Sequence, residues 1–254
     1  MSMWRGIAAG LVLVMVTAVG WAHKPPDASC QAFSGTFVRL TTKGGHHFDV
    51  YRAGPPSARI GLLLLPGKAR LGERALAWAD RVGAQGYRVL ALGLRRTGGR
   101  GRRMAMERTA LQYLSSPGRR LVTFGWGRSG AYESIEASAA DPHDVSGTVL
   151  CNGGISAKAA LMRRIESRVL VLAFRQTTPL PKLQAFEARM RLYGKPLAVH
   201  YYSMDPTAAD PMGAQFASAT AQEVWAQARA FFRQARFLCR RCAPYPALLF
   251  GYRD

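Results

Sequence analysis

Acidic residues and lysine are scarce in this sequence. Of its 254 residues, 15 are Asp or Glu and 35 are Lys or Arg, which gives a formal net charge of +20. Six of the 35 basic residues are lysine, so arginine carries most of the positive charge. A basic excess indicates nucleic acid, an anionic membrane surface or an acidic ligand as the partner. A general arginine bias also results from codon composition, so the positions of the arginines have to decide between these explanations.

Internal repeats, low-complexity segments and long apolar runs beyond the N-terminus are absent from the sequence. Their absence excludes collagen-like, low-complexity and polytopic membrane proteins. Hydrophobic residues make up 48% and aromatic residues 10% of the chain, which excludes a disordered protein and is enough for a large core. The length suits one α/β domain, since such domains often have ~200–250 residues.

The long uncharged apolar run at the N-terminus predicts a secretory signal peptide over residues 1–22. Arg5 supplies the positive start, Ile7–Val19 forms the apolar run, and Gly20 and Ala22 are the small residues before a cleavage site. Thirteen apolar residues rise only ~20 Å as a helix, whereas the hydrocarbon core of a membrane is ~30 Å thick. We therefore expect a periplasmic or secreted protein in which residues 23–254 form the mature chain. An uncleaved membrane anchor over the same segment is the alternative.

Cysteine is rare, with four residues: Cys30, Cys151, Cys239 and Cys242. Disulfides persist in exported proteins. Cys30 lies just before the predicted fold and the other pair follows its last helix, so we expect Cys30 to pair with Cys239 or Cys242. Cys151 ends an apolar run, which predicts a buried thiol. The C-x-x-C pair lacks both the strand-then-helix setting of a redox site and further ligands for zinc, so we expect no metal and no cofactor.

The order of apolar runs predicts an α/β fold. Phe37–Leu40 and His46–Tyr51 flank Lys43-Gly44-Gly45 and predict an antiparallel hairpin. Continuous apolar runs predict strands buried on both faces: Ile60–Leu65, Tyr87–Leu92, Leu121–Phe124, Val145–Leu150, Val169–Phe174 and Leu197–Tyr202. Helical stretches lie between and after them, at roughly 71–85, 103–115, 130–139, 156–166, 182–193 and 217–237. The repeated β–α units predict a single-domain, three-layer sandwich around a mostly parallel sheet with an antiparallel N-terminal hairpin.

A glycine-rich turn follows one of the central strands. Leu121–Phe124 leads into Gly125-Trp126-Gly127-Arg128-Ser129-Gly130-Ala131 and then into a helix. Functional groups of such sheets gather at the carboxyl ends of the strands, and a glycine-flanked strand-to-helix turn is the setting of a nucleophile elbow. Two registers fit this turn. One places Gly127 in the position of the nucleophile, and the other makes Ser129 the nucleophile.

Further stretches occur in a particular order and spacing around this turn. They are Ala84–Tyr87 with Val89–Ala91, Gly125-Trp126 with Tyr132, Val169–Leu172 with Phe186–Ala188 and Gly194–Leu197, and Val199–Tyr202 through Asp210-Pro211 to Trp225. In this pattern, from Arg59 to Gln234, the chain resembles the dienelactone hydrolase family of α/β-hydrolases. The resemblance implies an α/β-hydrolase fold and a hydrolytic site that consists of a nucleophile, an acid and a histidine.

The four catalytic positions that the resemblance implies hold residues without acid, base or nucleophilic capacity. The family's cysteine nucleophile corresponds to Gly127, its aspartate to Thr177, its histidine to Pro206, and the glutamate after its first parallel strand to Gly67. We therefore assign no catalytic residue with the family's chemistry and expect a degenerate, non-catalytic member.

Ser129 is the nucleophile under the alternative, a hydrolase of carboxylic esters or lactones. It needs a general base within hydrogen-bonding reach. His46 and His47 lie on the predicted hairpin, His143 precedes a strand and so belongs to the opposite edge of the sheet, and His200 lies inside a strand. None of these positions is the usual place of a catalytic histidine.

Five arginines fall within nine residues directly after the predicted strand Tyr87–Leu92: Arg95, Arg96, Arg100, Arg102 and Arg103. A loop at this point emerges on the ligand-binding edge of the sheet, beside Arg128. Its backbone N–H groups and guanidinium groups suit phosphate, sulfate or carboxylate. The alternative is a solvated loop without a ligand.

We therefore expect an exported, catalytically inactive dienelactone hydrolase-like protein that binds an anion or a partner in the cell envelope. The candidate partners are an anionic small molecule, an envelope polyanion and an acidic protein, and contact with a membrane surface fits the same charge. We expect no nucleic acid partner, because export removes the protein from cytosolic nucleic acid.

Overall fold

The structure is a computed structural model that describes residues 33–94, 99–153, 155, 158–203 and 218–234. All described helices and strands belong to one compact unit. The predicted signal peptide over residues 1–22 lies outside the described residues, and so do Cys30, Arg95, Arg96, Pro206, Cys239 and Cys242.

The described residues form an eight-stranded mixed sheet with the order β1-β2-β4-β3-β5-β6-β7-β8. The hairpin strands β1 (Thr36–Thr41) and β2 (His47–Ala53) are antiparallel, and β2 also pairs antiparallel with β4. The remaining pairings are parallel and join β3 (Ile60–Leu65), β4 (Arg88–Ala91), β5 (Arg120–Trp126), β6 (Val145–Cys151), β7 (Arg168–Phe174) and β8 (Leu197–Tyr202). The predicted mostly parallel sheet with an antiparallel hairpin is confirmed.

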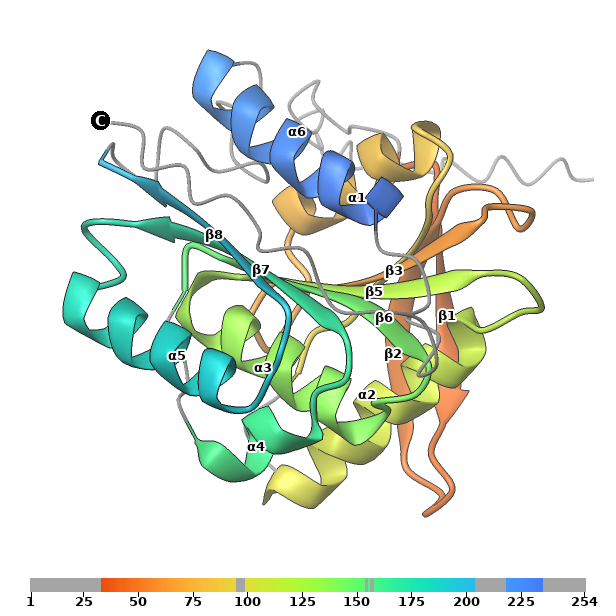
Figure 1. The fold of residues 1–254 in the computed structure, drawn as a ribbon. Coiled ribbons are helices and arrows are strands. Elements are labelled where there is room, and N and C mark those ends of the chain that lie inside the picture. The colour runs from red at the N-terminus through yellow and green to blue at the C-terminus, as the bar shows by residue number, and fades with distance from the viewer. Residues whose placement is uncertain (1–32, 95–98, 154, 156–157, 204–217, 235–254) are drawn as a thin grey trace, which may run out of the picture. The chain divides into compact units, whose positions relative to one another are not determined.

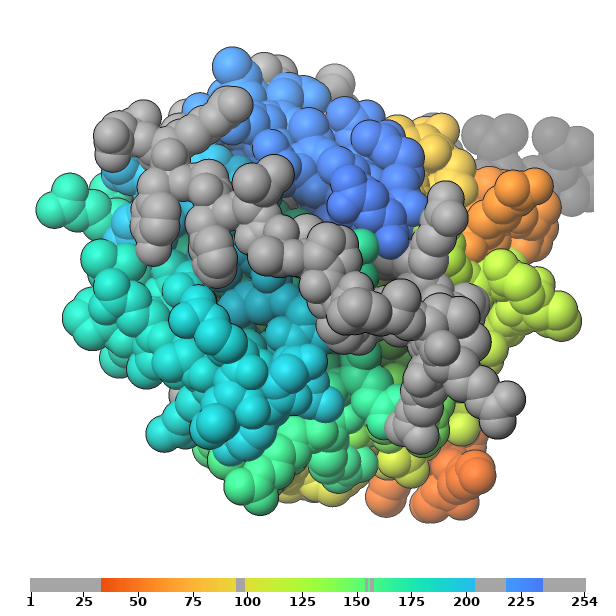
Figure 2. All heavy atoms as spheres, viewed as in Figure 1, coloured from red at the N-terminus to blue at the C-terminus, as the bar shows by residue number. Residues whose placement is uncertain are grey.

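Helices cover both faces of this sheet. The described helices are α1 (Glu73–Ala84), α2 (Gly99–Leu114), α3 (Gly127–Ala140), α4 (Ala159–Arg164), α5 (Leu180–Leu192) and α6 (Ala219–Gln234). Figure 1 shows α1 and α6 on one face and α2, α3, α4 and α5 on the other. In the space-filling view, atoms of α6 (blue) and α5 (cyan) both reach the surface (Figure 2). The predicted three-layer sandwich is therefore confirmed. None of the described helices has the length and apolar character to span a membrane.

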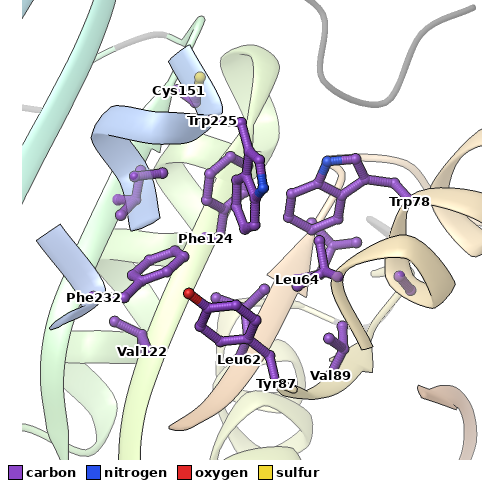
Figure 3. Close-up of a cluster of buried hydrophobic side chains, with 14 of the residues drawn as sticks. Leu62, Leu64, Trp78, Tyr87, Val89, Val122, Phe124, Cys151, Trp225 and Phe232 are labelled. Carbon is purple, nitrogen blue, oxygen red and sulfur yellow. The ribbon is translucent and has the colours of Figure 1, made fainter. Parts of the chain in front are cut away.

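Aromatic side chains fill the core between the sheet and helices α1 and α6. Trp78 of α1, Phe124 of β5, and Trp225 and Phe232 of α6 gather there (Figure 3). The ring centroids of Trp78 and Trp225 are 5.2 Å apart in an edge-to-face arrangement, which aromatic pairs favour. Cys151 belongs to the same buried cluster, so its predicted burial is confirmed.

Three helices begin earlier than the sequence pattern predicts, α5 by two residues and α2 and α3 by more. α2 starts at Gly99 instead of 103, so Arg100, Arg102 and Arg103 are helical and do not form a loop. Residues three positions apart lie on one face of a helix, which lets Arg100 and Arg103 reach the same partner on α3. α3 starts at Gly127 instead of 130, because this glycine turns the chain directly from strand into helix.

Candidate functional site

Gly127 forms a sharp turn between β5 and α3. Its φ of +69° lies in the left-handed region that favours glycine, and a Cβ there would have no described atom within 4 Å. A Cβ on Gly125 would overlap the Gly130 carbonyl, and a Cβ on Gly130 would overlap the Leu65 carbonyl. Only glycine fits at these two positions, because the start of α3 packs directly against the ends of β3 and β5. The turn has the geometry of a nucleophile elbow, with a residue that lacks a side chain at its left-handed position.

The loops after β3 and β6 approach this turn from two sides. Gly67 has a left-handed φ of +67°, and a Cβ there would lie 3.1 Å from Cβ of Ser129. A Cβ on Gly153 would lie 2.6 Å from the Gly127 carbonyl oxygen. Three of the positions singled out in the sequence, Gly67, Gly127 and Ser129, therefore lie together at the carboxyl edge of the sheet.

Thr177 lies at the same edge, in the loop after β7. Its hydroxyl donates a hydrogen bond to Oδ1 of Asn152, 2.7 Å away in the loop after β6. The neighbouring Thr178 hydroxyl donates to the Gly153 carbonyl at 3.0 Å. Asn152 has a φ of 51°, which asparagine adopts more often than most residues. These bonds tie two edge loops together, and they supply no carboxylate at the position where the resemblance implies an aspartate.

Ser129 is exposed in the first turn of α3, two residues after the left-handed glycine. Within the described part of the chain, no histidine forms a hydrogen bond with it. His143 lies at the opposite edge, before β6, with Nδ1 3.1 Å from Oε2 of Glu166. His200 lies in β8, two residues before the end of the strand. The predicted positions of both histidines are confirmed.

The predicted arginine cluster has two different environments in the structure. Arg100 Nε lies 2.8 Å from Oε1 of Glu136, and Arg103 Nη2 lies 3.5 Å from its Oε2, so α3 compensates part of the positive charge. Arg102 is exposed and forms no ion pair or hydrogen bond among the described residues. Arg128 is also exposed, at the start of α3.

A cavity of about 530 Å³ lies between the hairpin, the loop after β3 and the first turns of α2. β2 runs antiparallel to β4 and its first residues extend beyond the end of β4, which places the cavity at the carboxyl edge of the sheet. The lining combines polar and apolar side chains: His47, Asp49, Arg70, Arg102 and Arg103 with Phe37, Phe48, Leu71 and Met106. No sequence pattern indicates this cavity, because it joins segments that are far apart in the chain.

Three glutamates are buried between α2 and α3. Glu107 of α2 and Glu136 of α3 have no exposed surface, and Glu133 of α3 is 7% exposed. Among the described residues, both carboxyl oxygens of Glu107 and one of Glu133 have no hydrogen-bond partner. The charged groups that act on these two side chains come from the same two helices: Arg100, Arg103 and the glutamates themselves.

Burial shifts the pKa of two of these carboxyl groups. It raises the pKa of Glu107 well above its ordinary value, the neighbouring Glu136 and Glu133 raise it further, and Arg103 and Arg100 oppose the shift. Burial also raises the pKa of Glu133 from 4.5 to about 7. Burial therefore favours the neutral form of the Glu107 carboxyl group, and Glu133 titrates near neutrality.

These glutamates were not among the candidates predicted from the sequence. The signal for them is weak, since Glu133 and Glu136 stand in the alanine- and serine-rich stretch 131–140. In the ranges that the structure describes, no three His, Cys, Asp or Glu side chains are placed to hold a metal ion.

Comparisons with known proteins identify the fold. The sequence matches no protein-family model and no curated protein. A putative dienelactone hydrolase from Klebsiella pneumoniae is similar in structure, with 15% identity, a TM-score of 0.63 and coverage of 78% of this chain and 99% of the other. A dienelactone hydrolase-like promiscuous phosphotriesterase from metagenomic libraries has 19% identity, a TM-score of 0.64 and coverage of 79% and 98%. An esterase from Pyrococcus furiosus has 13% identity, a TM-score of 0.61 and coverage of 80% and 93%. At these identities the similarity shows the α/β-hydrolase fold, as predicted from the sequence, and nothing about activity.

Proposed function

We propose that this α/β-hydrolase-fold chain is an exported protein without hydrolytic activity that binds an anionic ligand or partner at the carboxyl edge of its sheet. The observation that carries the proposal is the elbow, where Gly127 holds the left-handed position without a side chain. A hydrolase of this fold attacks its substrate with a side chain from that position.

The surroundings of the elbow support the loss of catalysis. A nucleophile of this kind needs a base that takes its proton and an acid that orients the base. Gly67 offers no side chain, and the hydroxyl of Thr177 is used in its bond to Asn152. Neither position holds an ionisable group.

The arginines of the neighbouring cavity support anion binding. Arg102 and Arg70 line the cavity and have no acidic partner among the described residues. A guanidinium group binds carboxylate, phosphate or sulfate through parallel hydrogen bonds. An anionic small molecule, an envelope polyanion and an acidic protein all provide such groups. The export part of the proposal rests on the signal-peptide pattern of residues 1–22.

A hydrolase that uses Ser129 is the second candidate. The exposed Ser129 lies against Gly67 at the start of α3, which favours it. Structures of the same fold include a phosphotriesterase and an esterase. This candidate requires Ser129 to become acylated or phosphorylated during turnover.

Labelling with a fluorophosphonate probe separates the two candidates. We expect no covalent adduct on Ser129 by mass spectrometry and no turnover of p-nitrophenyl acetate above the solvent rate. Ser129→Ala is compared with Ser115→Ala, a second exposed serine that lies at the end of α2. Labelling or turnover that disappears in Ser129→Ala and persists in Ser115→Ala would establish the hydrolase and refute our proposal.

A further inference from the structure

The described lining of the cavity beside α2 has more positive than negative charge. Arg39 donates hydrogen bonds to both carboxylate oxygens of Asp49, at 2.9 and 3.3 Å, so the carboxylate in the lining is already paired. Arg103 is paired with α3. Arg70 and Arg102 form no ion pair or hydrogen bond within the described ranges. The uncompensated charge of the cavity is therefore that of two guanidinium groups.

The same cavity exposes an apolar surface. Phe37 of β1 is 59% exposed, the highest value for an aromatic side chain in the described part of the chain. Phe48 is buried, and Leu71 and Met106 are half-buried in the same lining. An apolar group that covers Phe37 removes this surface from water, which favours binding by about 25 cal/mol per Å².

We propose that this cavity binds a small amphipathic carboxylate, with its carboxylate at Arg70 and Arg102 and its apolar body against Phe37 and Met106. The inference rests on the proposed function, because it assumes that the edge of the sheet serves binding. The volume of about 530 Å³ suits a small molecule, since ligand pockets commonly have ~300–1,000 Å³.

The lining favours this ligand class over a hydrated polyanion. A polyanion brings several charges, and each loses hydration when it approaches apolar side chains without a partner. Among the described residues, Arg70 and Arg102 are the two unpaired cations of the cavity, which match the two oxygens of one carboxylate. The apolar side chains of the lining contribute to binding only if the ligand also carries an apolar part.

Isothermal titration calorimetry with three related compounds tests the ligand class. Octanoate has both parts of the ligand, acetate has the carboxylate alone, and 1-octanol has the chain alone. We expect octanoate to bind the purified protein at least tenfold more tightly than acetate or octanol, because only octanoate gains both contributions. A tenfold difference corresponds to about 1.4 kcal/mol.

Three variants test the location. Arg102→Gln is expected to weaken octanoate binding about tenfold by removing a charge-assisted bond, and Phe37→Ser about threefold by removing apolar contact. Arg164→Gln at the end of α4, near the opposite edge of the sheet, is the matched control and should leave binding unchanged. All three side chains are exposed, and an unchanged urea-unfolding midpoint checks that each variant is folded.

Other outcomes overturn the inference in distinguishable ways. If octanoate binds no more tightly than acetate, or only as tightly as inorganic phosphate, the ligand needs no apolar part. The cavity would then be an anion site without preference for an amphipathic carboxylate. Octanoate binding that Arg102→Gln and Phe37→Ser do not change places the site elsewhere. Failure of the proposed function is detected separately, by labelling and turnover at Ser129.

Discussion

The carboxyl edge of the sheet and the interface between α2 and α3 differ in the side chains that they bring together. Non-ionisable residues surround Gly127 at the edge, whereas carboxyl groups are buried at the interface. At the edge, where α/β sheets carry their chemistry, glycines, threonines and an asparagine make the contacts around Gly127. Between the two helices, Glu107, Glu133 and Glu136 are buried with few partners. Strongly shifted pKa values and the catalytic position of the fold are therefore separated in this molecule.

This difference limits the common inference that a carboxyl group with a shifted pKa marks a functional site. Perturbed carboxyl groups cluster at functional sites, but structural networks shift pKa values as well. Here the shifted groups, Glu107 and Glu133, are buried between two helices and not in the loops around the left-handed glycine. The comparison predicts that the interface controls stability, whereas the elbow contributes little to it beyond the shape of the turn.

The largest expected effect is a pH dependence of stability caused by Glu133. Its pKa rises from 4.5 to about 7 on folding, so the folded chain retains a proton that the unfolded chain has lost. The free energy of unfolding is therefore highest below pH 4.5 and falls as the pH rises to about 7. Between pH 5 and pH 8, we expect the natural chain to lose about 2–3 kcal/mol more than Glu133→Gln, as measured by urea unfolding.

The variant isolates one group, because other carboxyl groups contribute equally to both proteins. Parallel loss of stability in the natural chain and in Glu133→Gln would mean that Glu133 is not the titrating group. The contrast between the interface and the edge would then lose its main energetic support.

A smaller effect is expected from Glu107, which is buried and has no hydrogen-bond partner among the described residues. Replacement by methionine keeps a similar volume and removes the unpaired polar atoms, so Glu107→Met should stabilise the fold by about 1–2 kcal/mol at pH 7. The measurement is the urea-unfolding midpoint at constant m-value. Glu73→Met, at the exposed first turn of α1, is the control and should have almost no effect. Destabilisation by Glu107→Met would indicate that the carboxyl group makes a contact essential to the interface.

The smallest effect is expected at the elbow itself. Gly127→Ala places an L-residue in the left-handed region, and the space around the new Cβ is open, so only backbone strain opposes it. We expect a loss of about 1 kcal/mol in urea unfolding. Gly130→Ala serves as the contrast, because its Cβ would overlap the Leu65 carbonyl. Equal losses in the two variants would show that the left-handed turn is not the reason for glycine at Gly127.

Much of the fold follows from local patterns in the sequence. The bounds of Ile60–Leu65 and Leu197–Tyr202 were predicted to the residue from continuous apolar runs. Ile60–Leu65 is buried on both faces, as such a run predicts, whereas Leu197–Tyr202 is an edge strand whose residues are mostly half-buried. The glycines of the elbow were recognised because a tight strand-to-helix turn has few sequence solutions. The start of α2 was missed, because a run of arginines and glycines predicts a solvated loop. The ion pairs of Arg100 and Arg103 with Glu136 on α3 cannot be inferred from the sequence around them.

The candidate site was harder to predict, because it depends on contacts between distant segments. The bond from Thr177 to Asn152 joins two loops, and the cavity joins Phe37 on the hairpin to Arg102 on α2. The buried glutamates depend on how two helices face each other, which the residues around Glu107 do not specify. Tertiary packing, and not local propensity, decides each of these features.

The close packing of Gly125 and Gly130 has a consequence for the way hydrolases are recognised from sequence. These glycines are required because backbone atoms of α3, β3 and β5 occupy the space of a side chain, whether or not bonds are broken nearby. A correctly seated helix needs such a pattern whether or not the turn carries a catalytic residue. A sequence search based on the glycines of this turn therefore detects an architecture and collects catalysts and non-catalysts alike.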